Sequence, residues 1–490
     1  MPMSDSPHGH SHFGDRLRNW VSLSGLVIML GSVFAFLMLF IVDMMKGSAN
    51  PYVGILTYLV TPAFSTLGVT LVVLGIVLKR RQERREGRRT PIVLDLSRPH
   101  DRRILGVFVV GSIIFLFVSA FGSYTSYQFT ESVTFCGQAC HEVMEPEMVT
   151  YSHSPHARVS CVECHIGPGA TWFVRSKLSG TYQVYATLLN KYPRPVPTPI
   201  ENLRPARDTC EECHWPQRFS GDLVRTYQHY LSDQENTEYS VRVMLRVGGG
   251  DPDQREVSGI HWHIANQVEY IATDPARLEI PWVRLTDSQG RQTEFRTPEF
   301  TEDIGKHEIR TMDCIDCHNR PAHIYKKPND AVDRALTQGW IDRALPAIRA
   351  KATEVLVQEY ASKDEALEQI AEILDAAYPD QPAIRPAIEA VQRIYSENFF
   401  PTMNANWRAY PEHIGHKDWP GCVRCHDDNH FSSDGQRKIS FSNCNSCHLI
   451  LAQGKGEELE LTSLGGQEFR HPGEDYDPAF KCHDCHTGGP

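Results

Sequence analysis

The N-terminal part of the chain alternates long apolar stretches with short charged ones. Three uncharged apolar stretches lie between Trp20 and Asp43, between Lys46 and Lys79, and between Arg103 and Glu131. Each is long enough to cross a hydrocarbon core of about 30 Å as a helix. A cleaved signal peptide is disfavoured for the first stretch, because its apolar core is too long and no clear small-residue cleavage site follows. We therefore predict a cytoplasmic N-terminus at 1–19 and three transmembrane helices at 20–45, 52–78 and 104–128.

The loop at 79–103 is strongly basic and sets the predicted orientation. It holds ten Lys/Arg against four Asp/Glu, and under the positive-inside rule such a loop stays in the cytoplasm. The connection Gly47–Pro51 and everything after Glu131 then lie outside a bacterial inner membrane, in the periplasm. The whole chain carries a formal charge of −11, so about −17 falls on the exported part. An acidic exported surface suits either a basic partner or simple solubility.

Hydrophobic patterns in the exported part predict a small sheet and a helical insert. Between Val224 and Phe300 the segments VRVMLRV and VEYIAT alternate as strands do, and IPWVRLT and RQTEFRT flank a turn at Asp287–Gly290 as in a hairpin. Between Asp330 and Asn398, apolar residues recur at helical spacing. This second region contains no cysteine, and we interpret its apolar residues as a core.

All 14 cysteines stand in seven close pairs, each followed at once by histidine. Two thiols at this spacing can add to the vinyl groups of a haem while the next imidazole ligates the iron. Zinc knuckles do not require that histidine, and a disulfide within a pair would close almost no loop. Numbered 1 to 7 in chain order, the motifs are Cys136, Cys140 and His141; Cys161, Cys164 and His165; Cys210, Cys213 and His214; Cys314, Cys317 and His318; Cys422, Cys425 and His426; Cys444, Cys447 and His448; and Cys482, Cys485 and His486.

These features predict a membrane-anchored multihaem c-type cytochrome with seven covalently attached haems and three transmembrane helices. The exported domain should be mainly helical and irregular, wrapped around the haems, because the polypeptide per haem is too short for a conventional core. Its predicted segments are 129–220 with three motifs, 221–325 with the β insert and motif 4, the haem-free helical insert 326–400, and 401–490 with the last three motifs.

The supply of distal iron ligands decides between electron transfer and substrate chemistry. A haem with two protein ligands mainly transfers electrons, whereas an open axial position admits a substrate. Outside the motifs the exported part has twelve histidines, more than there are distal positions. The predicted distal ligands are His156, His323, His416, His430 and His471; for each, an exposed or hydrogen-bonded histidine is the alternative.

Motif 1 differs from the others, because it has one extra residue between its cysteines and because Met144 and Met148 follow His141. A thioether ligand raises the potential of a haem and suits a site where electrons enter from a quinol. A methionine that only fills a gap in the packing is the alternative.

The region 104–219 resembles the NapC/NirT family of membrane-anchored quinol dehydrogenases. The resemblance is carried by FCGQACHEVMEPE, SPHARVSCVECHIGPGATWFVRSKLSG and CEECHWP. It implies a methionine-ligated haem beside a quinol pocket, with Met144 matching the methionine ligand and Lys177 matching a pocket lysine. Because Met144 follows His141 by three positions rather than the family's two, Met148 and His141 stay alternative ligands.

The pocket aspartate of that family has no counterpart, since residues 166–191 contain no carboxylate. Gln183 lies in this stretch, and the proton acceptor is expected among Glu142, Glu145 and Glu147. Seven haems with three spans are most similar to heptahaem inner-membrane cytochromes of metal-reducing bacteria. This similarity implies a (mena)quinol dehydrogenase that passes electrons from the quinol pool to periplasmic or outer-membrane multihaem cytochromes, with no nucleic-acid partner.

Two other functions remain open at this point. A terminal reductase of a small nitrogen or sulfur compound would need a haem without a distal ligand. An electron-relay subunit of a larger membrane complex would use the first two spans for docking.

Overall fold

The chain is described from a computed structural model. The described residues are 19–46, 60–86, 97–139, 141–167, 170–198, 200, 204–216, 219, 221–249, 259–287, 289–442, 444–473, 477 and 480–489. They fall into two compact units: one runs to Ser132 and includes Ile166–Ser179, and the other combines Val133–His165 with the residues from Gly180 onward.

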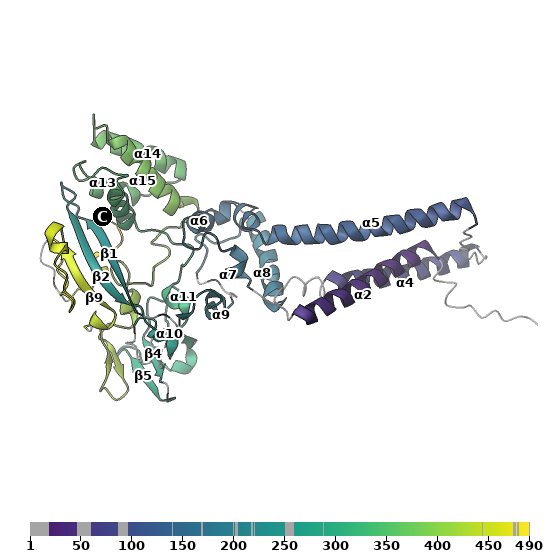
Figure 1. The fold of residues 1–490 in the computed structure, drawn as a ribbon, viewed down its shortest axis with the longest axis horizontal. Coiled ribbons are helices and arrows are strands. Elements are labelled where there is room, and N and C mark those ends of the chain that lie inside the picture. The colour runs from purple at the N-terminus through teal and green to yellow at the C-terminus, as the bar shows by residue number, and fades with distance from the viewer. Residues whose placement is uncertain are drawn as a thin grey trace, which may run out of the picture. The chain divides into compact units, whose positions relative to one another are not determined.

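The first unit contains an antiparallel pair of apolar helices. Its helices are α2 (Trp20–Lys46), α4 (Thr61–Glu86) and α5 (Pro99–Thr130). In Figure 1, α2 and α4 run side by side, and a Cβ added to Gly25 of α2 would lie 2.6 Å from the carbonyl oxygen of Gly68. The hydroxyl of Ser32 donates a hydrogen bond to the carbonyl of Thr61. Glycines at the contact and hydroxyl bonds between helices are typical of packing inside a membrane.

Two helices among the described residues are long and apolar enough to span a membrane, at Trp20–Leu37 and Thr61–Gln82. The first lies within the predicted span 20–45, and the second overlaps the predicted span 52–78 and ends four residues beyond it. The region of the third predicted span lies in α5, a continuous helix of 32 residues, and its crossing of a membrane stays a prediction. Gly47–Pro51 and residues 87–96 of the basic loop lie outside the described residues.

Most of the haem motifs of the second unit begin short helical turns. A single turn places two cysteines three positions apart on neighbouring sides of the helix end, with the histidine directly after them. The elements that carry or flank motifs are η2 (Phe135–Ala139), α6 (His141–Ser152), α7 (Cys161–His165), α8 (Ala170–Leu188), α9 (Ala206–Cys210), α11 (Cys314–Cys317), η6 (Gly421–Arg424), η7 (Cys444–Ser446) and α16 (Cys482–Cys485).

Two antiparallel sheets join segments that are far apart in the chain. The first has the order β1-β2-β9 and the second the order β6-β3-β4-β5-β7-β8. The predicted hairpin is confirmed as β4 paired with β5. The strands are β1 (Asp222–Tyr230), β2 (Glu238–Arg246), β3 (Gln267–Ile271), β4 (Trp282–Thr286), β5 (Gln292–Arg296), β6 (Arg310–Thr311), β7 (His430–Ser432), β8 (Lys438–Ile439) and β9 (His448–Gly454).

The sheets tie the predicted β insert to the last motifs. Strand β9 begins at His448 of motif 6 and pairs with β2, while β7 follows motif 5 and pairs with β5. The C-terminal motifs therefore share a hydrogen-bonded framework with residues more than a hundred positions earlier, which local hydrophobic patterns do not reveal. The short turns around them are α10 (Trp262–Ala265), η4 (Ile304–Lys306), η5 (Pro401–Met403) and η8 (Gly456–Leu459).

The helical insert is confirmed and holds the largest apolar core of the described residues. It consists of α12 (Pro328–Thr337), α13 (Ile348–Leu356), α14 (Lys363–Ala377) and α15 (Ile384–Asn398). Ile348, Ile370 and Val391 are fully buried between these helices. The same core reaches Val143 of α6, so the insert supports the helix that follows motif 1.

Candidate electron-transfer site

Six pairs of imidazole rings face each other in the second unit, and each pair contains one motif histidine. Each histidine of motifs 2 to 7 thus has a partner ring from another part of the chain. For motifs 2 to 7, the pairs and their ring-centroid distances are His165–His323 (6.3 Å), His214–His156 (6.0 Å), His318–His261 (6.3 Å), His426–His263 (5.8 Å), His448–His416 (6.1 Å) and His486–His471 (6.0 Å).

This spacing fits a haem iron between the two rings of each pair. A metal–imidazole bond is about 2 Å long and the nitrogen lies about 1.1 Å from the ring centre, so two imidazoles on one iron have centroids ~6.2 Å apart. The observed separations run from 5.8 to 6.3 Å. Aromatic rings also pack directly at such distances, but direct packing gives no reason for one motif histidine to appear in every pair.

Hydrogen bonds at Nδ1 leave the opposite nitrogen of several partner rings available. An Nδ1–H that donates to a carbonyl fixes the tautomer and leaves the Nε2 lone pair for a metal. The histidines and the backbone carbonyl oxygens bonded to their Nδ1 atoms are His156 with Pro321 (3.1 Å), His261 with Val247 (2.7 Å) and His263 with Ile260 (2.9 Å).

Burial favours the neutral, ligating form of the rings. A histidine must be uncharged at the nitrogen that binds a metal, and removal from water disfavours the imidazolium ion. Burial lowers the pKa of seven of these twelve rings: His165, His263, His318, His416, His426, His448 and His486.

His430, a predicted distal ligand, lies outside the six pairs. It is only 1% exposed, with Nδ1 2.8 Å from a carboxylate oxygen of Asp427 and Nε2 2.6 Å from the carbonyl oxygen of Ile280. Both ring nitrogens are therefore used within the protein. We leave His430 out of the proposed ligand set.

The other four predicted distal histidines, His156, His323, His416 and His471, each face a motif histidine. The partners are not always the nearest motif, since His156 precedes motif 2 but faces His214 of motif 3. The sequence reasoning missed His261 and His263. The sequence feature that could have indicated them is the segment HWH, whose two histidines lie two positions apart at one helical turn.

The motifs follow one another in space in the order that they have in the chain. Motif 7 lies beside motif 6, because the Cys482 sulfur is 3.9 Å from Nδ1 of His416, the ring that faces motif 6. For motifs 1 to 6, neighbouring cysteine sulfurs are Cys136 and Cys161, Cys164 and Cys210, Cys210 and Cys314, Cys317 and Cys422, and Cys422 and Cys447.

Hydrogen bonds of the residues between the paired cysteines connect motifs 4 and 5. Asp316 of motif 4 is buried, and its carboxylate accepts hydrogen bonds from Tyr270 at 2.6 Å and Arg277 at 2.7 Å. Arg424 of motif 5 donates to the backbone carbonyls of Asp316 at 2.8 Å and Arg277 at 2.9 Å. A buried charged network of this kind fixes geometry strongly, because every partner left unpaired would be costly.

At motif 1 the structure places one methionine against the motif backbone. A Cβ added to Gly137 would lie 2.5 Å from the sulfur of Met148, so this thioether packs between the two cysteine positions. Met144 is half-buried on the same helix. Cys140 and the side chain of His141 lie outside the described residues, and the choice of iron ligand at motif 1 stays a prediction.

The residues expected at a quinol pocket are only partly described. Lys177 and Gln183 lie on α8, where Gln183 is exposed. The side chains of Lys177 and Glu142 lie outside the described residues. Glu145 pairs with Lys363 at 3.2 Å.

Glu147 is held as an anion. Burial alone would raise its pKa, but the hydrogen bond with His323 and the charge of Arg320 bring the pKa of Glu147 to about 2. A carboxylate with so low a pKa is a weak base. Of the three candidate glutamates, Glu147 is therefore the least suited to accept a quinol proton.

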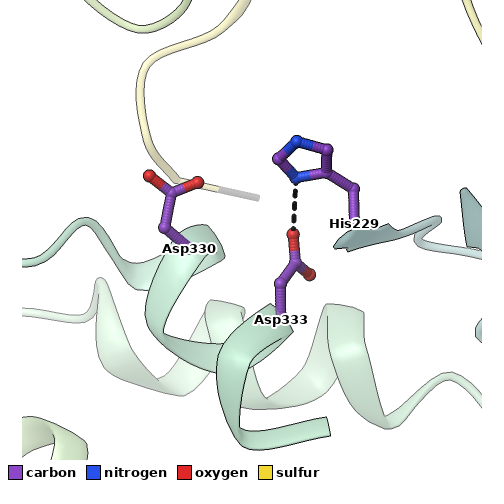
Figure 2. Close-up of side chains that lie close together, drawn as sticks. All are labelled: His229, Asp330 and Asp333. Carbon is purple, nitrogen blue, oxygen red and sulfur yellow. Dashed lines mark hydrogen bonds and ion pairs between the residues drawn. The ribbon is translucent and has the colours of Figure 1, made fainter. Parts of the chain in front are cut away.

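A second cluster of potential metal ligands is neutralised by neighbouring cations. His229, Asp330 and Asp333 come close together, and His229 Nδ1 lies 3.2 Å from Asp333 (Figure 2). However, Arg349 lies 3.2 Å from Asp333 and Lys417 lies 3.0 Å from Asp330. Carboxylates already paired with two cations offer a divalent metal little net attraction, so we assign no metal to this cluster.

Comparison with known proteins agrees with this arrangement. Residues 98–196 match the model of the NapC/NirT cytochrome c family, N-terminal region. The chain is 44% identical to the cytochrome c-type protein ImcH of Geobacter sulfurreducens, over 96% of this chain and 95% of that protein. It is also 33% identical to the cytochrome c-type protein NrfH of Wolinella succinogenes, over 15% of this chain and 44% of that protein. No solved structure matches.

The motifs, the apolar helices and these matches define a membrane-anchored multihaem c-type cytochrome of electron transport, which carries covalently bound haem c. Over nearly its whole length the chain belongs to the family of ImcH, and its residues 98–196 form a region of the NapC/NirT type.

Proposed function

We propose that this cytochrome oxidises a quinol, such as menaquinol, at the membrane surface and passes the electrons to multihaem cytochromes of the periplasm or outer membrane. Seven haems would be bound through the fourteen motif cysteines, with the motifs in the periplasm and the basic loop 79–103 in the cytoplasm. Haem, when bound, supplies a one-electron carrier at each iron. A quinol that releases two electrons in this way also releases two protons outside.

The observation that carries the proposal is the set of six ring pairs. Each motif from 2 to 7 has a second imidazole at the spacing of a shared iron, and an iron with two protein ligands has no position for a substrate. The described geometry therefore favours an electron carrier over a terminal reductase of a nitrogen or sulfur compound.

The spatial order of the motifs supports a path without branches. Neighbouring cysteine sulfurs connect consecutive motifs from 1 to 6, and Cys482 contacts the ring that faces motif 6. We assign electron entry to motif 1, where Met144 and Met148 offer the weaker ligand set, and exit to motif 7. Lys177 would bind a quinol oxygen, Gln183 would lie nearby, and Glu142 or Glu145 would accept the protons.

The test is reduction of the purified, fully haem-loaded protein by menadiol, followed through the haem absorption bands. We expect rapid reduction that a quinol-site inhibitor abolishes. Lys177→Met should slow it at least tenfold, because the pocket loses a hydrogen-bond donor to the quinol. The matched control is Lys191→Met, since Lys191 follows the same helix but bonds to Tyr185 at 3.0 Å.

Protein that dithionite reduces fully but menadiol does not reduce would contradict quinol oxidation. That outcome would favour the relay subunit of a larger complex. Equal slowing by both lysine substitutions would remove Lys177 from the proposed pocket.

A further inference from the structure

One ligand pair lies beside a carboxylate that is largely shielded from water. His323, which faces His165 of motif 2, has its Nδ1 3.0 Å from a carboxylate oxygen of Glu147 and 3.0 Å from the backbone carbonyl of the same residue. Nη2 of Arg320 lies 2.9 Å from both carboxylate oxygens, and the Tyr325 hydroxyl donates to one of them at 3.2 Å. Glu147 is thus surrounded by three donors, one of which is the imidazole.

Other contacts of Arg320 fix the positions of the groups around Glu147. Arg320 Nε donates to the backbone carbonyl of His323 at 2.7 Å, and its guanidinium lies 4.0 Å from the ring centre of Tyr410. Arg320 is 13% exposed and Glu147 17% exposed at the side chain. Shielding from water makes the charges interact more strongly than surface charges do.

In three other partner rings, Nδ1 lies next to a weaker hydrogen-bond acceptor. His156, His261 and His263 each direct Nδ1 to a neutral backbone carbonyl. A carboxylate carries a full negative charge, so it draws the Nδ1 proton more strongly and makes the opposite nitrogen a better electron donor to a metal. The ligand pair of motif 2 is therefore electronically distinct from these three.

We propose that Glu147 is a positioning residue that orients His323 and lowers the reduction potential of the haem at motif 2. This inference rests on the proposed assignment of His165 and His323 as the two ligands of that haem. Oxidation of the iron adds one positive charge, which a more basic imidazole and a nearby carboxylate stabilise. Arg320 pairs with both oxygens of the carboxylate, while the carboxylate is the group that touches the ring.

The consequence is a haem that stays oxidised next to the entry site. Glu147 and the two methionines of motif 1 stand on one helix, α6, so the same element would hold both the first and the second carrier. A lower potential at motif 2 makes electron transfer from motif 1 less favourable and onward transfer to motif 3 more favourable.

The test compares Glu147→Gln with the wild-type protein by spectroelectrochemical titration, with mediators in place of a quinol. The amide keeps the shape of the carboxylate but loses its charge. We expect the reduction potential of one low-spin haem to rise by about 59 mV. For one electron this equals a change of about tenfold in the ratio of its reduced to its oxidised form. Haem content and near-infrared magnetic circular dichroism report whether all the bis-imidazole sites survive.

Two further variants separate this effect from general damage. Glu147→Asp keeps the charge and should leave the shifted haem closer to its wild-type potential. Glu302→Gln is the matched control, since Glu302 bonds to Nε2 of His307 at 2.8 Å and His307 faces no motif histidine whose ring is described. Its removal should leave every potential unchanged.

Unchanged potentials in Glu147→Gln, with haem content and bis-imidazole signals intact, would overturn the inference. Equal shifts in the Glu302→Gln protein would overturn it as well. Conversion of one haem to a high-spin form in Glu147→Gln, reversed in Glu147→Asp, would support the orienting role. Because mediators supply the electrons, failure of menadiol oxidation would refute the proposed function without changing this result.

Discussion

The assignment of a ligand at motif 5 gives the sharpest test of the ring-pair geometry, because two histidines compete for it. The sequence pointed to His430, four positions after His426. The structure instead places the ring of His263 5.8 Å from that of His426. We therefore compare His263→Ala with His430→Ala in the fully haem-loaded protein.

The two substitutions should have opposite spectroscopic and energetic effects. On the proposed assignment His263→Ala removes one axial ligand, so one haem should change from low-spin to high-spin while the spin states of the others stay unchanged. His430→Ala should leave the spin state of every haem as it is in the wild-type protein. It removes hydrogen bonds of 2.8 Å to Asp427 and 2.6 Å to Ile280 at a site that is 1% exposed, which should cost about 2–5 kcal/mol of folding free energy.

Electron paramagnetic resonance of the air-oxidised protein counts the high-spin sites, and thermal unfolding reports the stability. The high-spin signal must be compared with that of the wild-type protein, because motif 1 is itself a candidate high-spin site. His307→Ala serves as a control, since His307 bonds to Glu302 and, among the described residues, faces no motif histidine. A new high-spin haem in His430→Ala, and none in His263→Ala, would refute the use of ring spacing to assign ligands.

Two further predictions concern charges in the framework. Asp316→Asn should lower the free energy of unfolding by about 3–5 kcal/mol, because it leaves Arg277 buried without its charged partner. Glu238→Gln, which loses a partly exposed pair with Arg343, should lower it by at most about 1 kcal/mol. Equal losses of the two variants in denaturant titrations would contradict this reasoning. Burial alone would raise the pKa of Asp330, but Lys417 and Lys327 lower it below the ordinary value. The stabilisation from Asp330 should therefore be complete above its unfolded pKa of about 3.9 and disappear as the pH falls through the lower folded pKa. The stability difference between wild type and Asp330→Asn should shrink on acidification from pH 6 to pH 3, and a difference that grows would show that this ion pair is not stabilising.

The local features of this protein could be predicted from its sequence. The turn at Asp287–Gly290 between two alternating segments indicated the β4–β5 hairpin, and the apolar spacing between Asp330 and Asn398 indicated the helical insert. Both patterns depend on neighbours within a few residues, so a single sequence contains them. The cysteine motifs are equally local, since attachment and the first iron ligand are fixed within five or six positions.

The partner rings could not be predicted in the same way, because a haem is a flat group whose two faces are covered by separate chain segments. His416 stands six positions before motif 5 but faces His448 of motif 6. Proximity in sequence therefore does not indicate which motif a histidine faces. His323 faces His165 across more than 150 residues, and nothing in the intervening sequence encodes that distance.

The proposed ligand pairs would also replace much of the missing apolar core. Apart from the helical insert, the buried apolar clusters of the described residues are small, as around Tyr270 and Trp282. Segments that share an iron are linked as firmly as segments that share a core, since removal of a ligand releases both. The turn α10 is the clearest case, because His261 and His263 face motifs 4 and 5 from one helical turn. Together with the hydrogen bonds of Asp316 and Arg424, this turn would make motifs 4 and 5 the rigid centre of the electron path. A substitution in α10 should therefore disturb two haems, whereas a substitution at motif 7 should disturb one.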